Sequence, residues 1–497
     1  MSTLRHRQLL LSLKHSTIEA SFSVPMLQLT LGYMPFVIGF AVAALGWDAA
    51  GVGFLAATPF LGYVLQPPIS FLLQRRFSQR EVVQWAFVAN AAPWFLVLLF
   101  PYLSPAARDL LFAAIAYVSA QANAVCGVAW SAAMSDLVPL QIRGRFFGRR
   151  NLIYGFWAVL AVLAAGQIAD WTHNSLGAFG ALFATAAVSR LIGLHFFNRQ
   201  AFPSVVTQRC REPLELSEFR APLTDRGFLW SLAFNGLFGL FLFSGLPFYG
   251  VFVLRELHLT LGALAVMTTL GNVAGLLSVN TWGPLTDRYG VKPVMTGSVI
   301  LWTTSASLLW LLTGPRSSFL VYASFVIYGF MWALFQLLQF TLMINIAPPA
   351  HRTHYISTYY ASTYLLTLLG PFLGGYLLER LPLTWGPFFG QPFTRYHIVF
   401  VGSLLLCLAT LPLLRRVVEP TTGSLRDVMR HMRTSAEINP FLMLVSVAQV
   451  LFGGRALEIL VRQSRHAVRR HANVLADVGE ELVRGSWRAL SRPFRRE

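Results

Sequence analysis

Long runs of apolar residues, separated by short polar segments, dominate the hydropathy pattern of this 497-residue chain. Each run has about the length that a helix needs to cross a bilayer, roughly 20 residues. None alternates between apolar and polar positions, as a strand of an outer-membrane barrel would. Twelve runs can be drawn, at residues 20–45, 50–73, 82–101, 107–133, 148–170, 176–197, 228–254, 261–283, 291–313, 317–343, 354–379 and 395–415. The pattern predicts an all-α polytopic membrane protein with twelve transmembrane helices.

The composition supports this interpretation and excludes several other classes. Hydrophobic residues make up 55% of the chain and charged residues 12%, with a mean hydropathy of +0.56, whereas soluble proteins carry about a quarter charged residues. The three cysteines, Cys126, Cys210 and Cys407, show neither metal-ligand spacing nor a disulfide framework. No nucleotide-binding or hydrolase motif occurs in a suitable setting. We therefore expect no enzymatic activity, no cofactor and no metal site.

The basic residues are distributed unequally between alternate loops. With the N-terminus placed inside, the Lys and Arg residues of the predicted outer segments are only Arg108, Arg255, Arg316, Arg380 and Arg395. The positive-inside rule then places both termini in the cytoplasm, in agreement with the even number of spans.

The first apolar run, which ends near residue 45, is too long for the core of a signal peptide and has no convincing cleavage site. We therefore expect it to be retained as the first span. Lys14 and Lys292 are the only lysines among 39 basic residues, a bias that suggests a GC-rich bacterial genome. These features predict a multi-pass protein of the bacterial inner (cytoplasmic) membrane.

The two halves of the chain resemble each other at an offset of about 210 residues. The matching pairs are Pro139 with Pro348, Arg143 with Arg352, Gly166 with Gly375, Asp170 with Glu379, and Tyr117 with Tyr328. Because six spans separate the copies, both have the same topology, the parallel-repeat arrangement of one large transporter class. We expect an N-terminal half at 1–197, a cytoplasmic linker at 198–227, a C-terminal half at 228–415 and a tail at 416–497.

The segment GPLTDRYGVKPVM, from Gly283 to Met295, lies between the eighth and ninth predicted spans. It resembles the loop signature G-x-L-x-D-R-x-G-x-K of the major facilitator superfamily, and the resemblance extends over about residues 17–415. This likeness implies two six-helix bundles, a solute site between them near the bilayer midplane, and transport by alternating access. The corresponding first-half segment, ISFLLQRRFSQREVV, lacks the Gly and the Asp and departs from the family pattern.

Polar side chains in the middle of a span are costly and are therefore candidates for binding the solute. In the family that this chain resembles, the first, fourth, seventh and tenth spans line the cavity. The alternative for each residue is a hydrogen bond between helices, but four residues of the tenth span, from Tyr328 to Gln339, share one face. The predicted substrate cavity contains Gln28, Tyr33, Gln121, Asn123, Asn235, Asn272, Tyr328, Trp332, Gln336, Gln339 and Tyr364.

The predicted cavity has almost no charge, because no Arg, Lys, Asp or Glu falls at mid-depth in these four spans. A phosphate or dicarboxylate would require buried cations, so we expect a small, neutral or amphipathic organic solute. Glu19 is the candidate for proton coupling; the alternative is an interfacial charge at the start of the first span. The resulting hypothesis is a secondary active transporter. The alternatives are an exporter of lipophilic, drug-like or lipid-like compounds, and a non-transporting membrane assembly factor.

The inner loops suggest a cytoplasmic latch that closes in the outward-open state. By the repeat geometry, Asp287 should face the N-terminal end of the fifth span, where the helix dipole and nearby arginines attract a carboxylate. The alternative is that these arginines only set the topology. The predicted latch consists of Gly283, Asp287, Arg288, Gly290, Lys292, Asp136, Arg143, Arg145, Arg149 and Arg352.

The tail from residue 416 has a helical spacing of apolar residues flanked by arginines, which predicts a basic amphipathic helix. We expect this tail to lie on anionic lipid, to dock on the helical bundle or to bind a partner. The net charge of +18 is then explained by the cytoplasmic face, with no need for nucleic acid. The sequence leaves the oligomeric state open, with a monomer favoured.

Overall fold

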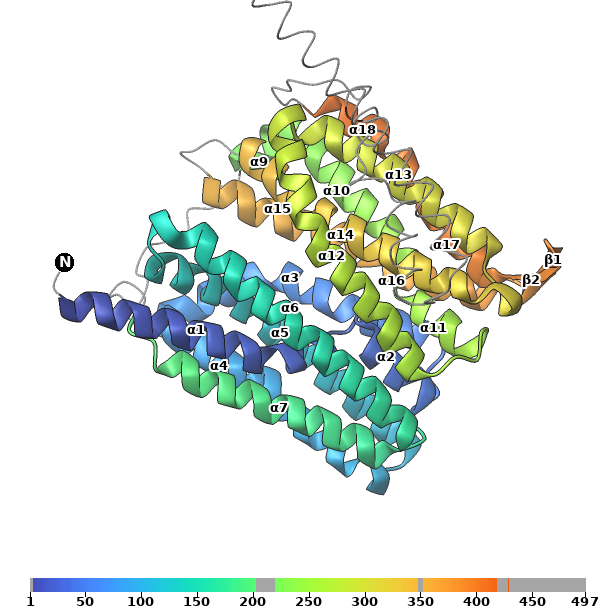
Figure 1. The fold of residues 1–497 in the computed structure, drawn as a ribbon, viewed down its shortest axis with the longest axis horizontal. Helices are drawn as coiled ribbons and strands as arrows, with labels where there is room; N and C mark the ends of the chain where they lie inside the picture. Colours follow the sequence, from blue (N-terminus) through green and yellow to red (C-terminus); the bar gives the residue numbers. More distant parts are fainter. Residues whose placement is uncertain (1–2, 203–219, 347–351, 418–427, 429–497) are drawn as a thin grey trace, which may run out of the picture. The chain divides into compact units, whose positions relative to one another are not determined.

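The computed structural model describes residues 3–202, 220–346, 352–417 and 428. Eleven of its helices are long and apolar enough to cross a membrane, and the bent pair α1 and α2 supplies a twelfth span. These helices lie in one unit, Met1–Leu425 (Figure 1). The prediction of an all-α polytopic protein with twelve spans is confirmed.

The first six spans follow one another with short connections. They are α1 (Thr3–Thr30) with α2 (Pro35–Ala43), α3 (Ala49–Arg76), α4 (Gln79–Ala91) with the 3₁₀ helix η1 (Ala92–Tyr102), α5 (Pro105–Leu137), α6 (Leu140–Trp171) and α7 (Leu176–Asn198). The short helix α9 (Arg220–Thr224) precedes the second half.

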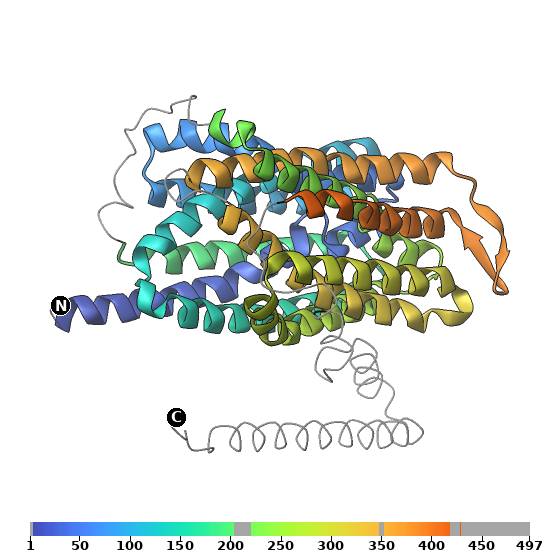
Figure 2. The ribbon, with the colours of Figure 1, turned by 90° about the horizontal axis from the view of Figure 1, so that it is seen from above.

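The last six spans repeat this order. They are α10 (Arg226–Gly245) with α11 (Phe248–Arg255), α12 (Leu261–Tyr289), α13 (Val291–Leu312), α14 (Phe319–Ile346), α15 (Arg352–Thr367) with α16 (Leu369–Arg380), and α17 (Arg395–Ala409) with α18 (Leu411–Arg416). A 3₁₀ turn, η3 (Pro315–Ser317), precedes α14, and an antiparallel hairpin of β1 (Thr384–Phe388) and β2 (Gln391–Thr394) precedes α17. This hairpin, which the sequence analysis did not predict, projects beyond the helices (Figure 2).

Several predicted spans are broken where proline removes a backbone donor. The first span bends by 42° between α1 and α2, directly before Pro35. The third changes from α to 3₁₀ geometry at Ala92, beside Pro93, and the seventh breaks at Pro247. Proline cannot donate the i to i−4 hydrogen bond, and neighbouring helices must satisfy the groups that it frees. Two of these breaks, at Pro35 and Pro247, lie beside the central cavity described below.

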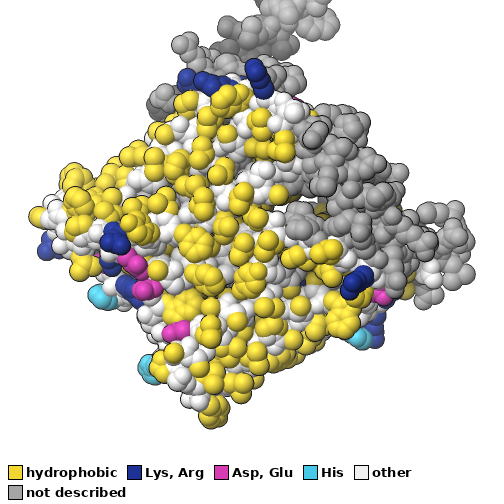
Figure 3. All heavy atoms as spheres, turned by 180° about the vertical axis from the view of Figure 1, so that it is seen from behind, with side chains coloured by type: hydrophobic (Ala, Val, Ile, Leu, Met, Phe, Trp, Pro, Cys, Tyr) yellow, Lys and Arg dark blue, Asp and Glu magenta, His cyan; other side chains and the backbone are white. Residues whose placement is uncertain are grey.

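The surface of the helical bundle suits a lipid environment. Large apolar side chains such as Phe156, Leu160 and Leu405 are well exposed. Figure 3 shows hydrophobic side chains over most of the visible face, with the charged ones mainly near its margins. Such an arrangement is expected where hydrocarbon rather than water surrounds the middle of the molecule.

The two halves meet along three sets of helices: α6 packs on α12, α3 packs on α15 and α16, and α2 packs on α11 and α12. Glycine permits the closest approach between α3 and α16. A Cβ atom on Gly53 would lie 2.6 Å from the Pro371 carbonyl oxygen, and one on Gly375 would lie 2.7 Å from the Ala49 carbonyl oxygen. Small residues therefore allow these two backbones to touch.

Two repeat-related carboxylates join the halves at the end that is predicted to face outside. Asp170, at the end of α6, accepts a hydrogen bond from the Gly262 backbone N–H at the start of α12, at 3.1 Å. Glu379, near the end of α16, accepts one from the Ala50 N–H at the start of α3, at 3.0 Å. Each carboxylate thus caps the positive N-terminal end of a helix from the other half. We call these two contacts the outer caps.

We predict that removing the outer caps favours opening of this end. A carboxylate at a helix N-terminus stabilises the capped state by about 1 kcal/mol. A free-energy difference of about 1.36 kcal/mol changes an equilibrium constant about tenfold. Asp170→Ala and Glu379→Ala should therefore each raise the ratio of outer-open to outer-closed molecules about fivefold. Double electron–electron resonance between labels at the exposed residues Tyr102 and Phe319, with the native cysteines replaced, measures this ratio.

Asp109→Asn is the matched control for this measurement. Asp109 lies near the same end, but it accepts a hydrogen bond from the Trp47 indole within the same half, at 2.7 Å. The distance distribution of the control should match that of the parent protein. Unchanged distributions in both cap variants would contradict a role for the outer caps in closure.

Candidate functional site: a cavity between the halves

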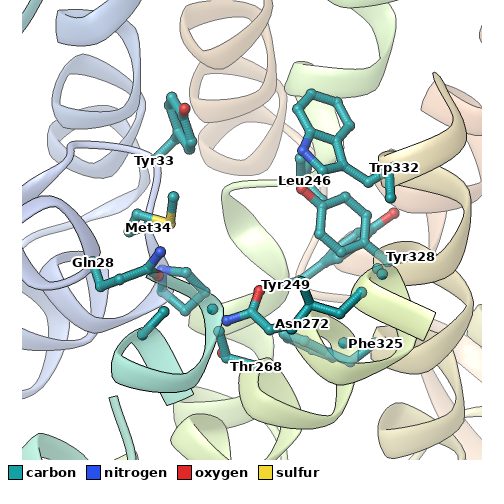
Figure 4. A pocket seen from close by; sticks show the side chains of 18 of the residues that line it. Gln28, Tyr33, Met34, Leu246, Tyr249, Thr268, Asn272, Phe325, Tyr328 and Trp332 are labelled. Carbon is teal, nitrogen blue, oxygen red and sulfur yellow. The ribbon is translucent and has the colours of Figure 1, made fainter. Parts of the chain in front are cut away.

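A cavity of about 630 Å³ lies between the two halves, at the level where α1 and α10 break. Its lining comes from α1, α2, α6, α11, α12 and α14, together with the breaks themselves (Figure 4). None of the described residues that line it carries a charged side chain. The polar and aromatic lining residues are Gln28, Tyr33, Asn151, Tyr154, Tyr249, Thr268, Asn272, Phe325, Tyr328, Trp332 and Gln336.

Aromatic rings form one wall of this cavity. Tyr328 and Trp332 are one helical turn apart on α14, and their rings stack with centroids 5.9 Å apart. The ring of Phe243 meets Trp332 edge-on at 6.0 Å and Tyr33 at 5.7 Å, so it connects α14 with the first half. In Figure 4, Gln28 and Met34 face Tyr328 and Trp332 across the cavity. Flat rings of this kind offer stacking surfaces to an apolar or ring-shaped solute.

A smaller cavity of about 100 Å³ adjoins the first and shares Tyr33, Trp332 and Gln336 with it. Its other lining residues include Asn235, Gln339 and Tyr364. Tyr364 stacks on Tyr63 of α3 at 4.6 Å, so aromatic contacts cross between the halves here too. The two cavities together form a polar but uncharged space along the interface.

Several amide groups around this space have unused hydrogen-bonding capacity. Asn272 Nδ2 is buried and makes no hydrogen bond to another described residue, and the same holds for Asn235 Oδ1. The Nδ2 atom of Asn235, in contrast, donates to the Ser231 carbonyl at 2.9 Å. A buried amide without a hydrogen-bond partner costs free energy unless a ligand or a water molecule supplies that partner.

The comparisons with known proteins agree with this architecture. The family model of the Major Facilitator Superfamily matches residues 21–278 and 246–461. The chain belongs to the Major Facilitator Superfamily. It is therefore a multi-pass membrane protein of a transporter family rather than an enzyme, and the resemblance noted in the sequence is confirmed.

Three solved structures of superfamily transporters illustrate the likeness, and at their low identities they show the fold alone. A mutant of the nucleoside transporter NupG gives a TM-score of 0.65 at 15% identity, covering 82% of this chain and 100% of its own. A bacterial homologue of the iron transporter ferroportin, in an inward-facing state, gives a TM-score of 0.60 at 16% identity, and the match covers 84% of this chain and 100% of the homologue. The inward-open xylose transporter XylE from E. coli gives a TM-score of 0.59 at 14% identity, and the match covers 84% of this chain and 99% of XylE. No curated protein sequence matches the chain.

Most of the predicted cavity residues lie in the two cavities of this superfamily member. Gln28, Tyr33, Asn272, Tyr328, Trp332 and Gln336 line the larger cavity, and Asn235, Gln339 and Tyr364 line the smaller one. The shared face of Tyr328, Trp332 and Gln336 was the strongest of these signals. Their role in binding a solute stays a prediction.

The structure places Gln121 and Asn123 elsewhere, which corrects their assignment to the cavity. Gln121 lies in an apolar groove formed by α3, α4 and α5, with neither side-chain amide atom hydrogen-bonded to a described residue. Asn123 faces a small cavity inside the first half. Both residues are on α5, which packs on α3 and α4 and contributes nothing to the described lining of the central cavity.

The fifth span lines the larger cavity although no residue of it was predicted to do so, and the eighth span contributes Thr268 beside the predicted Asn272. Asn151 and Tyr154 of α6, and Thr268 of α12, line the larger cavity but were not predicted. Asn151 and Tyr154 are three residues apart on one helical face, so a search for polar pairs at that spacing could have found them. Tyr249 offers no comparable signal, because it follows the break at Pro247.

Only part of the predicted latch lies among the described side chains, so the latch stays a prediction. Lys292 Nζ donates to the carbonyls of Arg415 and Val417, at 2.7 and 2.8 Å, so these two contacts cap the end of α18 within the second half. Arg149 and Arg288 are exposed, and Gly290 joins α12 to α13 with a positive φ of 84°. The side chains of Gly283, Asp287, Asp136, Arg143, Arg145 and Arg352 lie outside the described ones.

Glu19 is not an interfacial charge at the start of a helix. It lies within α1, is 2% exposed and forms an ion pair of 3.0 Å with Arg150 of α6. The Ser23 hydroxyl donates to its other carboxylate oxygen at 2.8 Å. Both residues of the ion pair belong to the first half, away from the lining of the central cavity.

Proposed function

We propose that this protein is a secondary active transporter of a small, neutral or weakly amphipathic organic solute, working by alternating access. The observation that carries the proposal is the uncharged central cavity of about 630 Å³ between the halves. This volume falls in the range of sites for small organic molecules, roughly 300–1,000 Å³. A phosphate or a dicarboxylate would lack the paired cations that such groups need.

The lining favours a molecule with hydroxyl or amide groups and a flat or apolar face. Asn272 and Gln336 offer amides that can donate and accept, and Tyr328 and Trp332 offer stacking surfaces. Nucleosides and xylose, named for two of the similar structures, are uncharged and rich in hydroxyl groups. A metal cation would find no carboxylate in the described lining.

The outer caps support an inward-open state for this conformation. Both cap contacts lie at the end that the positive-inside rule places outside, and Arg255 also donates to the Trp47 carbonyl between the halves there, at 2.5 Å. In this proposal both termini are cytoplasmic, the membrane is the bacterial inner membrane, and the basic tail rests on anionic lipid.

We predict that a neutral solute stabilises the purified protein through Gln336. A panel of nucleosides, pentoses and hexoses is screened by thermal unfolding, since a ligand at 100 times its Kd stabilises the folded state by about 2.7 kcal/mol. Gln336→Ala should weaken binding of the active solute about fivefold, the loss of one hydrogen bond of about 1 kcal/mol.

Gln121→Ala is the control, because it removes the same amide from the groove between α3, α4 and α5. Its solute response should equal that of the wild type. An equal response in Gln336→Ala would place the solute elsewhere. Stabilisation by lipophilic cations or fatty acids instead of polar solutes would favour the exporter alternative, to which Met34, Leu246 and Phe325 in the lining also point.

Truncation after Val417 separates a transporter from an assembly factor that acts through its tail. The cut retains the carbonyls of Arg415 and Val417 that Lys292 binds, so α18 keeps its cap. We expect the truncated protein to bind and transport its solute in proteoliposomes as the full chain does. Loss of cellular function without loss of solute binding would instead favour the assembly factor.

The cytoplasmic latch remains part of the proposal, with Asp287 as its central carboxylate. Asp287→Asn should change the transport rate while leaving the amount of protein in the membrane unchanged, because the charge biases a two-state motion rather than the fold. Transport kinetics in proteoliposomes and the expression level measure the two effects. Identical kinetics would rule the latch out.

A further inference from the structure

A further polar cavity, of about 150 Å³, has a described lining that comes from the first half, and it shares Tyr154 with the central cavity. It is lined by residues of α1, α4, α5, α6 and α7, and its charged and polar lining includes Glu19, Asn123, Cys126, Trp130, Arg150 and Arg190. We call it the inner cavity. It contains two guanidinium groups and one carboxylate, so its formal charge is not balanced.

The carboxylate among the described lining residues, that of Glu19, already has partners. Glu19 pairs with Arg150 at 3.0 Å and accepts a hydrogen bond from Ser23. Arg150 Nε also approaches the Ser16 carbonyl at 3.3 Å, and its guanidinium lies 4.3 Å from the centre of the Trp130 ring. This pair is therefore complete and leaves no negative charge for the second arginine.

Arg190 is buried without a counter-ion. It is 3% exposed, and no carboxylate of a described residue lies within 4.0 Å of it. Its guanidinium lies 3.6 Å from the centre of the Phe87 ring, Nη2 donates only to the Cys126 thiol at 3.4 Å, and Nε has no partner among the described residues. A thiol is a weak acceptor, and a buried cation without a partner is strongly unfavourable in a membrane.

A further unused donor lines the same cavity. The Trp130 indole N–H is buried and has no partner among the described residues, and an indole can only donate. Arg190 Nε and Trp130 Nε1 are therefore two donors of one cavity that both lack an acceptor. A negative ion would satisfy both donors and balance the charge of Arg190.

We propose that the inner cavity binds a monovalent anionic group, with Arg190 as its counter-ion and Trp130 as a second donor. One negative charge matches the single unbalanced positive charge. A cavity of about 150 Å³ holds a chloride ion with a few waters, at roughly 30 Å³ per water, or one carboxylate group. Tyr154 lines both this cavity and the central one, so the group can be a free ion or the anionic end of a solute.

Thermal unfolding and tryptophan fluorescence of the purified full-length protein test the site. Sodium chloride is titrated against sodium gluconate at constant ionic strength, and wild-type protein should show a saturable rise in Tm and a change in Trp emission. Arg190→Gln should raise the chloride Kd at least tenfold. Arg199→Gln, which removes an exposed arginine just after α7, should leave it unchanged.

Trp130→Phe provides a second variant in case Arg190→Gln does not fold. It removes the indole donor but keeps both arginines and Glu19, so the chloride Kd should rise several-fold while Tm without chloride changes little. The absence of a chloride-specific effect in the wild type would overturn the proposal. So would an equal chloride response in the wild type, Arg190→Gln and Trp130→Phe.

Diphenylacetate distinguishes the two sources of the anionic group, because a cavity of about 150 Å³ has room for about one benzene ring and cannot hold two rings together with a carboxylate. Stabilisation by chloride but not by diphenylacetate identifies a free ion. Stabilisation by diphenylacetate that is lost in both Arg190→Gln and Trp332→Ala identifies a solute that reaches across from the central cavity. The site does not depend on the solute proposed for the central cavity, so a failed solute screen would leave this test intact.

Discussion

At the end of the molecule that is predicted to face outside, two carboxylates cap helices of the opposite half. Asp170 and Glu379 occupy matching positions in the two repeats, and each accepts from a backbone N–H in the first turn of a helix across the interface. The first turn of any helix leaves such donors unpaired, so these contacts need no special partner side chain. The repeat thus provides two equivalent hydrogen bonds between the halves, both at the same end of the molecule.

This form of closure can be reversed at little cost. When the halves separate at this end, water can replace the carboxylate at each helix N-terminus and the carboxylate itself becomes hydrated. The difference is about 1 kcal/mol per contact, which suits two states of similar free energy. The glycine contacts of Gly53 and Gly375 likewise involve small surfaces that can part without leaving a large cavity.

The sequence predicted the spans and the repeat because both depend on hydropathy and on residue identity at fixed offsets. It predicted the Tyr328–Gln336 face because one helical period determines which residues share a face. It was wrong for Gln121 and Asn123, since the period does not say which face of α5 turns to the cavity. The pairing of Glu19 with Arg150 joins residues that are far apart in the chain, and nothing in the local pattern indicates it.

The two halves differ in chemistry where the inner cavity lies. At the offset that relates Asp170 to Glu379, Glu19 and Arg150 correspond to Phe228 and Tyr359. These aromatic residues also meet, with ring centroids 6.5 Å apart, in an apolar cluster of the second half. The same pair of helices is therefore joined by an ion pair in one half and by rings in the other. Since packed rings satisfy the fold, the architecture does not require buried charges at this position, and their presence beside Arg190 indicates a role that belongs to the first half alone.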